Sequence, residues 1–174
     1  MNLWLEIYFQ ENHILTIKLS NKLKSEKSPY LKQHENNPVN WLAWNKDSLK
    51  KAQVEKKPIF LSTGMNDIAS IKKTVKIIEK YKVPYAIFHC TNIYPTPDRL
   101  VRLGAMNELQ DNFNDAVIGL SDHTVSNHAC YGAVALGASI LERHVTLSRS
   151  MYGSDQAASL EMRGLRDLVG AARK

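Results

Sequence analysis

Residues 56–67 read KKPIFLSTGMND, and the apolar run PIFL ending in a polar turn is the stretch that decides the fold. Three further apolar runs begin near residues 85, 116 and 139. Counted from residue 58, the four starts lie 27, 31 and 23 residues apart, which leaves room for one helix between successive strands. Because the runs are continuous rather than alternating, they are typical of parallel strands covered on their faces.

Helical patterns fill the gaps between these runs. Residues 68–78 place isoleucine and valine at helical spacing, and further helical patterns cover residues 101–113 and 159–174. The sequence therefore predicts an α/β fold with about four βα units. Such a series forms either part of a (β/α)₈ TIM barrel or a small open α/β sheet.

The first third of the chain is more polar and less regular in its hydrophobic pattern than the rest. Residues 1–20 alternate weakly and predict a hairpin, whereas residues 21–41 are polar and proline-containing and predict an irregular surface segment. Residues 47–57 predict a short helix with Asp47 as its N-cap. We therefore divide the chain into an N-terminal segment, 1–57, and an α/β part, 58–174.

Composition limits the function classes. The 174 residues are 44% hydrophobic and 23% charged, as in a soluble globular protein of one domain. The formal charge of +6 comes from lysines that are spread singly, so a solvated surface explains it better than nucleic-acid binding. No apolar run approaches the roughly 18 residues of a membrane span. With only Cys90 and Cys130, the expected location is the reducing cytoplasm.

Polar side chains two residues apart follow three of the expected strands. The pairs are Asn92 and Tyr94, Ser121 and His123, and Glu142 and His144. Because strand side chains alternate in direction, both members of a pair point to one face. In either architecture the ligand site lies beyond the carboxyl ends of parallel strands, so we expect these pairs to meet there.

The two histidines of these pairs are candidate metal ligands. On neighbouring strands, His123 and His144 could bind one manganese, zinc or iron ion and leave positions open for substrate and water. The alternative is that each is a hydrogen-bonded histidine near a sheet edge. Ser62, Asn92 and Ser121 could hold phosphate or carboxylate oxygens, or they could serve as turn and capping residues.

Two residues beside these candidates are not expected to belong to the site, and several common catalytic motifs are missing from the sequence. His89 and Cys90 precede the strand end and are expected to be packing residues. The sequence contains no P-loop, CxxC or GxSxG motif, so nucleotide-binding, dithiol and serine-hydrolase functions have no positive signal.

From Lys57 to about Asp155 the chain resembles the sialic acid synthase (N-acetylneuraminate synthase) family. The segments that carry the resemblance are KPIFLSTGMNDIASIKKTV, HCTNIYPTP, RLGAMNEL, IGLSDHT and GAVALGASILERHVT. The resemblance implies a (β/α)₈ barrel that condenses phosphoenolpyruvate with an open-chain N-acetylated sugar aldehyde, such as N-acetylmannosamine, and releases phosphate. It also implies a divalent metal, usually Mn²⁺, with Mg²⁺ or another ion as alternatives.

The same resemblance assigns roles to residues. The positions that would contact phosphoenolpyruvate are Ser62, Asn92, Ser121 and His123. The positions that would bind the metal are His123 and His144. The positions that would face the sugar are Tyr94, Glu142 and Asp155, and the candidate catalytic residues are Glu142 and His144. The segment YGSDQAASLEMRGL departs from the family's usual loop, which weakens the assignment of Asp155.

The family pattern also extends beyond this chain. A complete member has four more βα units before KPIFLSTGM and a C-terminal antifreeze-like domain. We therefore expect a truncated or fused protein whose partner is a complementing barrel half or a second copy. The alternative is a non-catalytic fragment or fusion product that retains relic site residues.

A second resemblance concerns the front of the chain. Residues 26–62 resemble the start of a thioredoxin-like family related to spermatogenesis-associated protein 20, in the segments SPYL, QH, NPV and KPIFLS. No cysteine occurs before Cys90, so the redox motif of that family is missing. A thioredoxin-like domain fragment is therefore the third interpretation of the chain.

Overall fold

Four parallel strands form the centre of the molecule. The computed structural model describes residues 22–36 and 40–173. The strands are β1 (Ile59–Ser62), β2 (Tyr85–Cys90), β3 (Val117–Asp122) and β4 (Ile140–Arg143). They are hydrogen-bonded in the order β1-β2-β3-β4, and every neighbouring pair is parallel. This arrangement confirms the expected α/β partial barrel.

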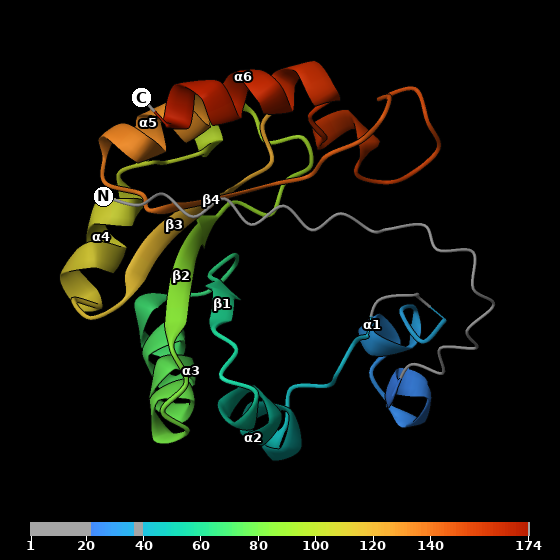
Figure 1. Cartoon of the computed structure of the whole chain (residues 1–174), viewed down its shortest axis with the longest axis vertical. Helices are drawn as coiled ribbons and strands as arrows, with labels where there is room; N and C mark the ends of the chain where they lie inside the picture. The colour runs from blue at the N-terminus through green and yellow to red at the C-terminus, as the bar shows by residue number, and fades with distance from the viewer. Residues whose placement is uncertain (1–21, 37–39, 174) are drawn as a thin grey trace.

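Helices follow the strands and lie along one side of the sheet (Figure 1). They are α3 (Ile68–Lys80), α4 (Ala105–Asn112), α5 (His128–Ala135) and α6 (Met162–Ala172), with short 3₁₀ turns at η2 (Asp98–Leu100) and η3 (Gln156–Ala158). The helix α3 begins where it does because Asp67 accepts a hydrogen bond from the Ser70 amide, at 2.8 Å. None of the described helices is long and apolar enough to cross a membrane.

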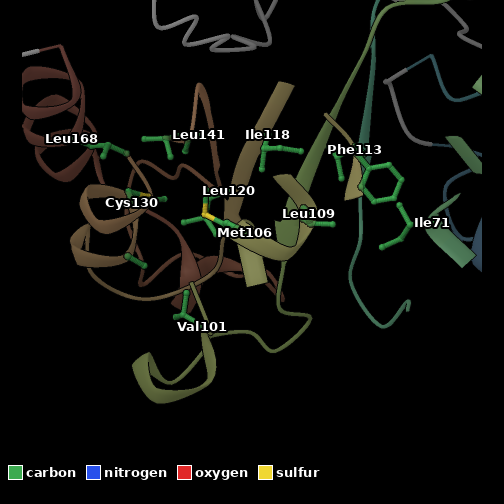
Figure 2. Packing of buried hydrophobic residues seen from close by; sticks show 14 of the residues in the cluster. Ile71, Val101, Met106, Leu109, Phe113, Ile118, Leu120, Cys130, Leu141 and Leu168 are labelled. Atoms are coloured by element: carbon green, nitrogen blue, oxygen red, sulfur yellow. The ribbon is translucent and has the colours of Figure 1, made fainter. Parts of the chain in front are cut away.

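The hydrophobic core lies between these helices and the sheet (Figure 2). Ile87, Leu120 and Leu141 come from three successive strands and pack against Met106 of α4 and Leu168 of α6. We call this side of the sheet the helix-covered face. Since strand side chains alternate, the residues between these positions point to the opposite side, which we call the open face.

The N-terminal segment differs from expectation in two respects. Two short helical turns, η1 (Lys22–Ser25) and α1 (Pro29–Lys32), occur where an irregular chain was expected. The helix α2 (Lys46–Val54) is capped by Asn45 and not by Asp47, because the extended backbone of Asn45 lets its side chain accept from the Ser48 amide at 2.9 Å. The hairpin expected over residues 1–20 lies outside the described residues.

Candidate active site

Three aromatic rings from successive strand ends meet on the open face. The ring centre of Tyr94 lies 4.1 Å from that of His123 and 5.8 Å from that of His144, and the two imidazole centres are 5.1 Å apart. These side chains follow β2, β3 and β4 in turn. The strand-end pairing therefore places both histidines and the tyrosine together, as the alternation of side chains predicts.

His123 is held in one orientation. Its side chain is buried, and its Nδ1 donates a hydrogen bond to the Thr91 carbonyl oxygen at 3.2 Å. Burial, reinforced by the nearby His144, lowers the pKa of His123 below its usual range. The neutral ring thus carries its proton on Nδ1 and leaves Nε2 as a free lone pair, which is the state that a metal ligand requires.

His144 faces a carboxylate. Its Nδ1 lies 3.8 Å from Oδ2 of Asp155, which precedes η3. Both side chains remain partly exposed. The contact places Asp155 at the edge of the histidine pair. At a shorter, hydrogen-bonding distance the Asp155 carboxylate could accept the Nδ1 proton of His144 and so orient the imidazole.

The histidine pair fits a divalent ion that has open coordination positions. Two imidazoles on one ion each place a nitrogen about 2 Å from it, which suits ring centres 5.1 Å apart. Among the described residues, no group of three or more histidine, cysteine, aspartate or glutamate side chains is arranged to hold a metal. An ion held by the two imidazoles alone would keep its other coordination positions open to further ligands, such as water or substrate oxygens.

A hydrogen-bonded pair lies beside the rings. Ser121 and Glu142 are register partners on β3 and β4, and the Ser121 hydroxyl donates to Oε1 of Glu142 at 2.6 Å. Ser121 is buried, whereas Glu142 is exposed on the open face. The serine therefore anchors one carboxylate oxygen and leaves the other for a ligand.

His89 and Cys90, both expected to be packing residues, point to opposite faces of the sheet, and the expectation is wrong for Cys90. His89 is buried on the helix-covered face and its Nε2 donates to the Val101 carbonyl oxygen at 2.6 Å, which confirms a packing role. Cys90 instead lies on the open face, in register with Ser121, and its thiol donates to Oδ1 of Asn92 at 3.0 Å. Burial raises the pKa of the Cys90 thiol, so it stays a neutral donor.

Ser62 stands apart from these groups. It ends β1 as expected, but its register partner is Phe88, two residues before Cys90. Ser62 therefore lies one layer lower on the open face than the Ser121–Glu142 pair. The structure brings together Tyr94, His123 and His144, with Asp155 at their edge, and it does not bring Ser62 into that cluster.

Gly64 makes room for the side chain of Asn92. A Cβ atom built on Gly64 would lie 2.1 Å from Oδ1 of Asn92, so Gly64→Ala should displace the Asn92 amide and take the acceptor away from the Cys90 thiol. Because only an exposed side chain has to move, we expect a change in unfolding free energy below about 1 kcal/mol. We expect Cys90 to react several times faster with a thiol-labelling disulfide reagent. Cys130, fully buried, serves as the internal reference.

Gly104→Ala is the matched control for this variant, because none of the residues that the structure describes has an atom within 4 Å of a Cβ built on Gly104. The control should label at the parent rate. Equal labelling of the Gly64→Ala and parent proteins would show that Gly64 does not set the position of Asn92.

These features define a class: half of a parallel α/β barrel that carries an open, histidine-containing site at the carboxyl ends of its strands. The NeuB family model matches residues 42–174, which include α2 and all four βα units. The chain belongs to the NeuB family.

Individual relatives agree with this assignment. The chain is 40% identical over 129 residues to the N,N'-diacetyllegionaminic acid synthase of Campylobacter jejuni, covering 72% of this chain and 38% of the relative. It is 36% identical over 125 residues to human N-acetylneuraminate-9-phosphate synthase, covering 72% and 35%. A solved N-acetylneuraminic acid synthetase from Leptospira borgpetersenii, in complex with citrate, superposes with a TM-score of 0.67 at 31% identity, over 73% of this chain and 44% of that one. The chain thus spans well under half the length of the relatives it matches.

Proposed function

We propose that this chain supplies part of the active site of a synthase that condenses phosphoenolpyruvate with an N-acetylated amino-sugar aldehyde. The observation that carries the proposal is the convergence of Tyr94, His123 and His144 at the strand ends. Family membership and relatives that are named as synthases of nine-carbon sugar acids support it.

The reaction forms one carbon–carbon bond, from the enolpyruvate methylene carbon to the aldehyde carbon. Water adds at the former enol carbon, phosphate leaves, and the aldehyde oxygen takes up a proton. In our proposal His123 and His144 would hold a divalent ion, Mn²⁺, which would supply Lewis-acid polarisation of the aldehyde oxygen.

The other side chains position the substrates. Asn92 and Ser121 are the proposed donors to the phosphate and carboxylate oxygens of phosphoenolpyruvate, with Ser62 one layer below them. Since the Ser121 hydroxyl has a single proton, it would turn from Glu142 to the substrate when phosphoenolpyruvate binds. Tyr94 and Asp155 are the proposed sugar contacts. Glu142, together with His144, is a proposed catalytic residue because each carries a titratable group at the open face.

The test is phosphate release from phosphoenolpyruvate in the presence of Mn²⁺ and N-acetylmannosamine. The chain alone is expected to release little phosphate, because it spans only 35–38% of the relatives' lengths. Addition of the missing barrel strands from a relative should produce activity that depends on the sugar. Mn²⁺ binding without activity in the completed barrel would favour the alternative, a non-catalytic fragment with relic site residues.

We further propose that the open face docks a complementary barrel half. In the described part of the chain, β1 and β4 each pair with one strand only, and the outer side of the chain just after β4 is bridged by Leu160 alone. Neither edge strand therefore has a second strand on its outer side. Phe60 and Val117 expose 38% and 44% of their surface on the open face. Closing the barrel would satisfy both edges and bury these apolar groups.

Charge favours a complementary half over a second copy. The site cluster contributes two carboxylates, Glu142 and Asp155, and no lysine or arginine. A second copy would double the carboxylates around an anionic substrate, whereas a complementary half can contribute cations. Light scattering after mixing with the missing strands of the Leptospira relative should give a one-to-one complex. A homodimer of this chain that excludes the added half would overturn the docking proposal.

A further inference from the structure

A buried ion pair lies directly behind the histidine site. Asp122 of β3 and Arg143 of β4 are register partners that point to the helix-covered face, and their side chains are only 1% and 3% exposed. An Nη1 hydrogen of Arg143 is donated to Oδ2 of Asp122. Each member of the pair immediately precedes one of the site histidines, His123 or His144.

The same two side chains fix the loop that follows β3. The guanidinium of Arg143 donates to the carbonyl oxygens of Thr124, at 2.6 Å, and of Ser126, at 2.9 Å. Oδ1 of Asp122 accepts from the Thr124 amide at 2.9 Å, and Oδ2 accepts from the Thr124 hydroxyl at 3.1 Å. His123 therefore lies between two residues that are both tied to β4.

We propose that the Asp122–Arg143 pair is a positioning device that sets how His123 and His144 face each other. This inference rests on the proposed two-histidine metal site. The side chains at positions 122 and 143 point away from that site, so they act through the backbone of the adjacent histidines. Because the pair and its carbonyl contacts cross-link the ends of β3 and β4, they restrict the relative movement of the two imidazoles.

A purely stabilising role explains these residues less well. A buried ion pair can often be replaced by apolar residues of similar size without loss of stability, because desolvation offsets the attraction between the charges. Nε of Arg143 is also buried and has no hydrogen-bond partner among the described residues, so the guanidinium does not use all of its donors there. What apolar residues could not reproduce is the pair of donated hydrogen bonds to the loop carbonyls.

The test compares Arg143→Lys with Leu168→Ala. Lysine keeps the charge but lacks the planar fork of donors, so it cannot reach Asp122 and both loop carbonyls together. Leu168→Ala removes a buried side chain of α6 from the core and so lowers stability, but Leu168 takes no part in the hydrogen bonds that tie Asp122, Arg143 and the loop together. Mn²⁺ affinity is measured by calorimetry on the full chain, at a temperature where circular dichroism shows each variant to be folded.

Arg143→Lys is expected to weaken Mn²⁺ binding about tenfold, the scale found for groups that orient metal ligands, while Leu168→Ala stays within about twofold of the parent. Affinity of Arg143→Lys within about twofold of the parent would overturn the proposal. Equal weakening in both variants would also overturn it, since the effect would then follow general stability.

A metal-free measurement separates this proposal from the proposed function. In histidine-selective ¹H–¹³C NMR spectra of the metal-free chain, Arg143→Lys should shift the ring signals of His123 and His144 and leave unchanged that of His34, which follows α1 in the N-terminal segment and stacks on Trp41. If the parent protein binds no Mn²⁺ but these shifts appear, the metal assignment fails and the positioning role stands. Unchanged ring signals at both site histidines would contradict the positioning role itself.

Discussion

Alanine at His123 or at His144 is expected to weaken the binding of Mn²⁺ by roughly a hundredfold or more, because each imidazole is one of only two protein ligands proposed for the ion. The ring centres 5.1 Å apart, and the Nδ1 hydrogen bond that leaves Nε2 of His123 free, are the geometric basis. Calorimetric titration of Mn²⁺ into the purified chain measures the effect directly.

His128→Ala is the control for these variants, because His128 is exposed at the start of α5 and is not one of the three rings in contact, Tyr94, His123 and His144. It should bind Mn²⁺ as the parent does. Parent-like affinity in both the His123→Ala and His144→Ala variants would mean that these histidines are not metal ligands.

Gly119→Ala is expected to lower the free energy of unfolding by about 2–3 kcal/mol, the upper part of the range for overpacked interior sites. A Cβ built on Gly119 would lie 2.6 Å from the Ile140 carbonyl oxygen of the neighbouring strand and 2.7 Å from the Phe88 ring. The carbonyl belongs to the backbone of β4, so it cannot move aside without disturbing the sheet. Urea denaturation followed by circular dichroism measures the change.

Gly170→Ala provides the matched control within α6. Within the described ranges, 22–36 and 40–173, no atom lies within 4 Å of a Cβ built on Gly170, so alanine should be neutral or should stabilise the helix by up to about 1 kcal/mol. If the Gly119→Ala protein unfolds with the same free energy as the Gly170→Ala protein, β3 and β4 do not approach each other as closely at Gly119 as the structure shows.

Much of the fold could be predicted from local patterns. Continuous apolar runs at spacings that admit one helix specify a parallel sheet, and Ile71, Val75 and Ile78 form the buried stripe of α3. The ring cluster could also be predicted, because the side-chain period of two puts Tyr94, His123 and His144 on the same face.

Other parts of the site depend on pairing between strands, which a single sequence does not display. Extending the same alternation back by two residues from Asn92 would have placed Cys90 on the open face. The sequence gives a weaker indication of the Asp122–Arg143 contact. It shows only that an acidic residue precedes one site histidine and a basic residue precedes the other. The contact between them follows from the register of β3 and β4, which places Asp122 opposite Arg143.

The N-terminal segment was the least predictable part. Asn45 competes with Asp47 as a cap, and the choice depends on the backbone angle at Asn45, which the sequence does not reveal. The family match begins at residue 42 and so includes α2. The boundary at residue 57, the thioredoxin-like resemblance of residues 26–62 and the cytoplasmic location stay predictions.

The central claim is that the open face of this half-barrel is part of a condensing site, and product stoichiometry in the completed barrel tests it most directly. Mass spectrometry and a phosphate assay would follow phosphoenolpyruvate, N-acetylmannosamine and Mn²⁺ together. We predict one phosphate and one nine-carbon sugar acid for each phosphoenolpyruvate consumed, with both products lost in the His144→Ala variant. Phosphate release that does not require the sugar, or a sugar acid that still forms at the parent rate in His144→Ala, would contradict the account.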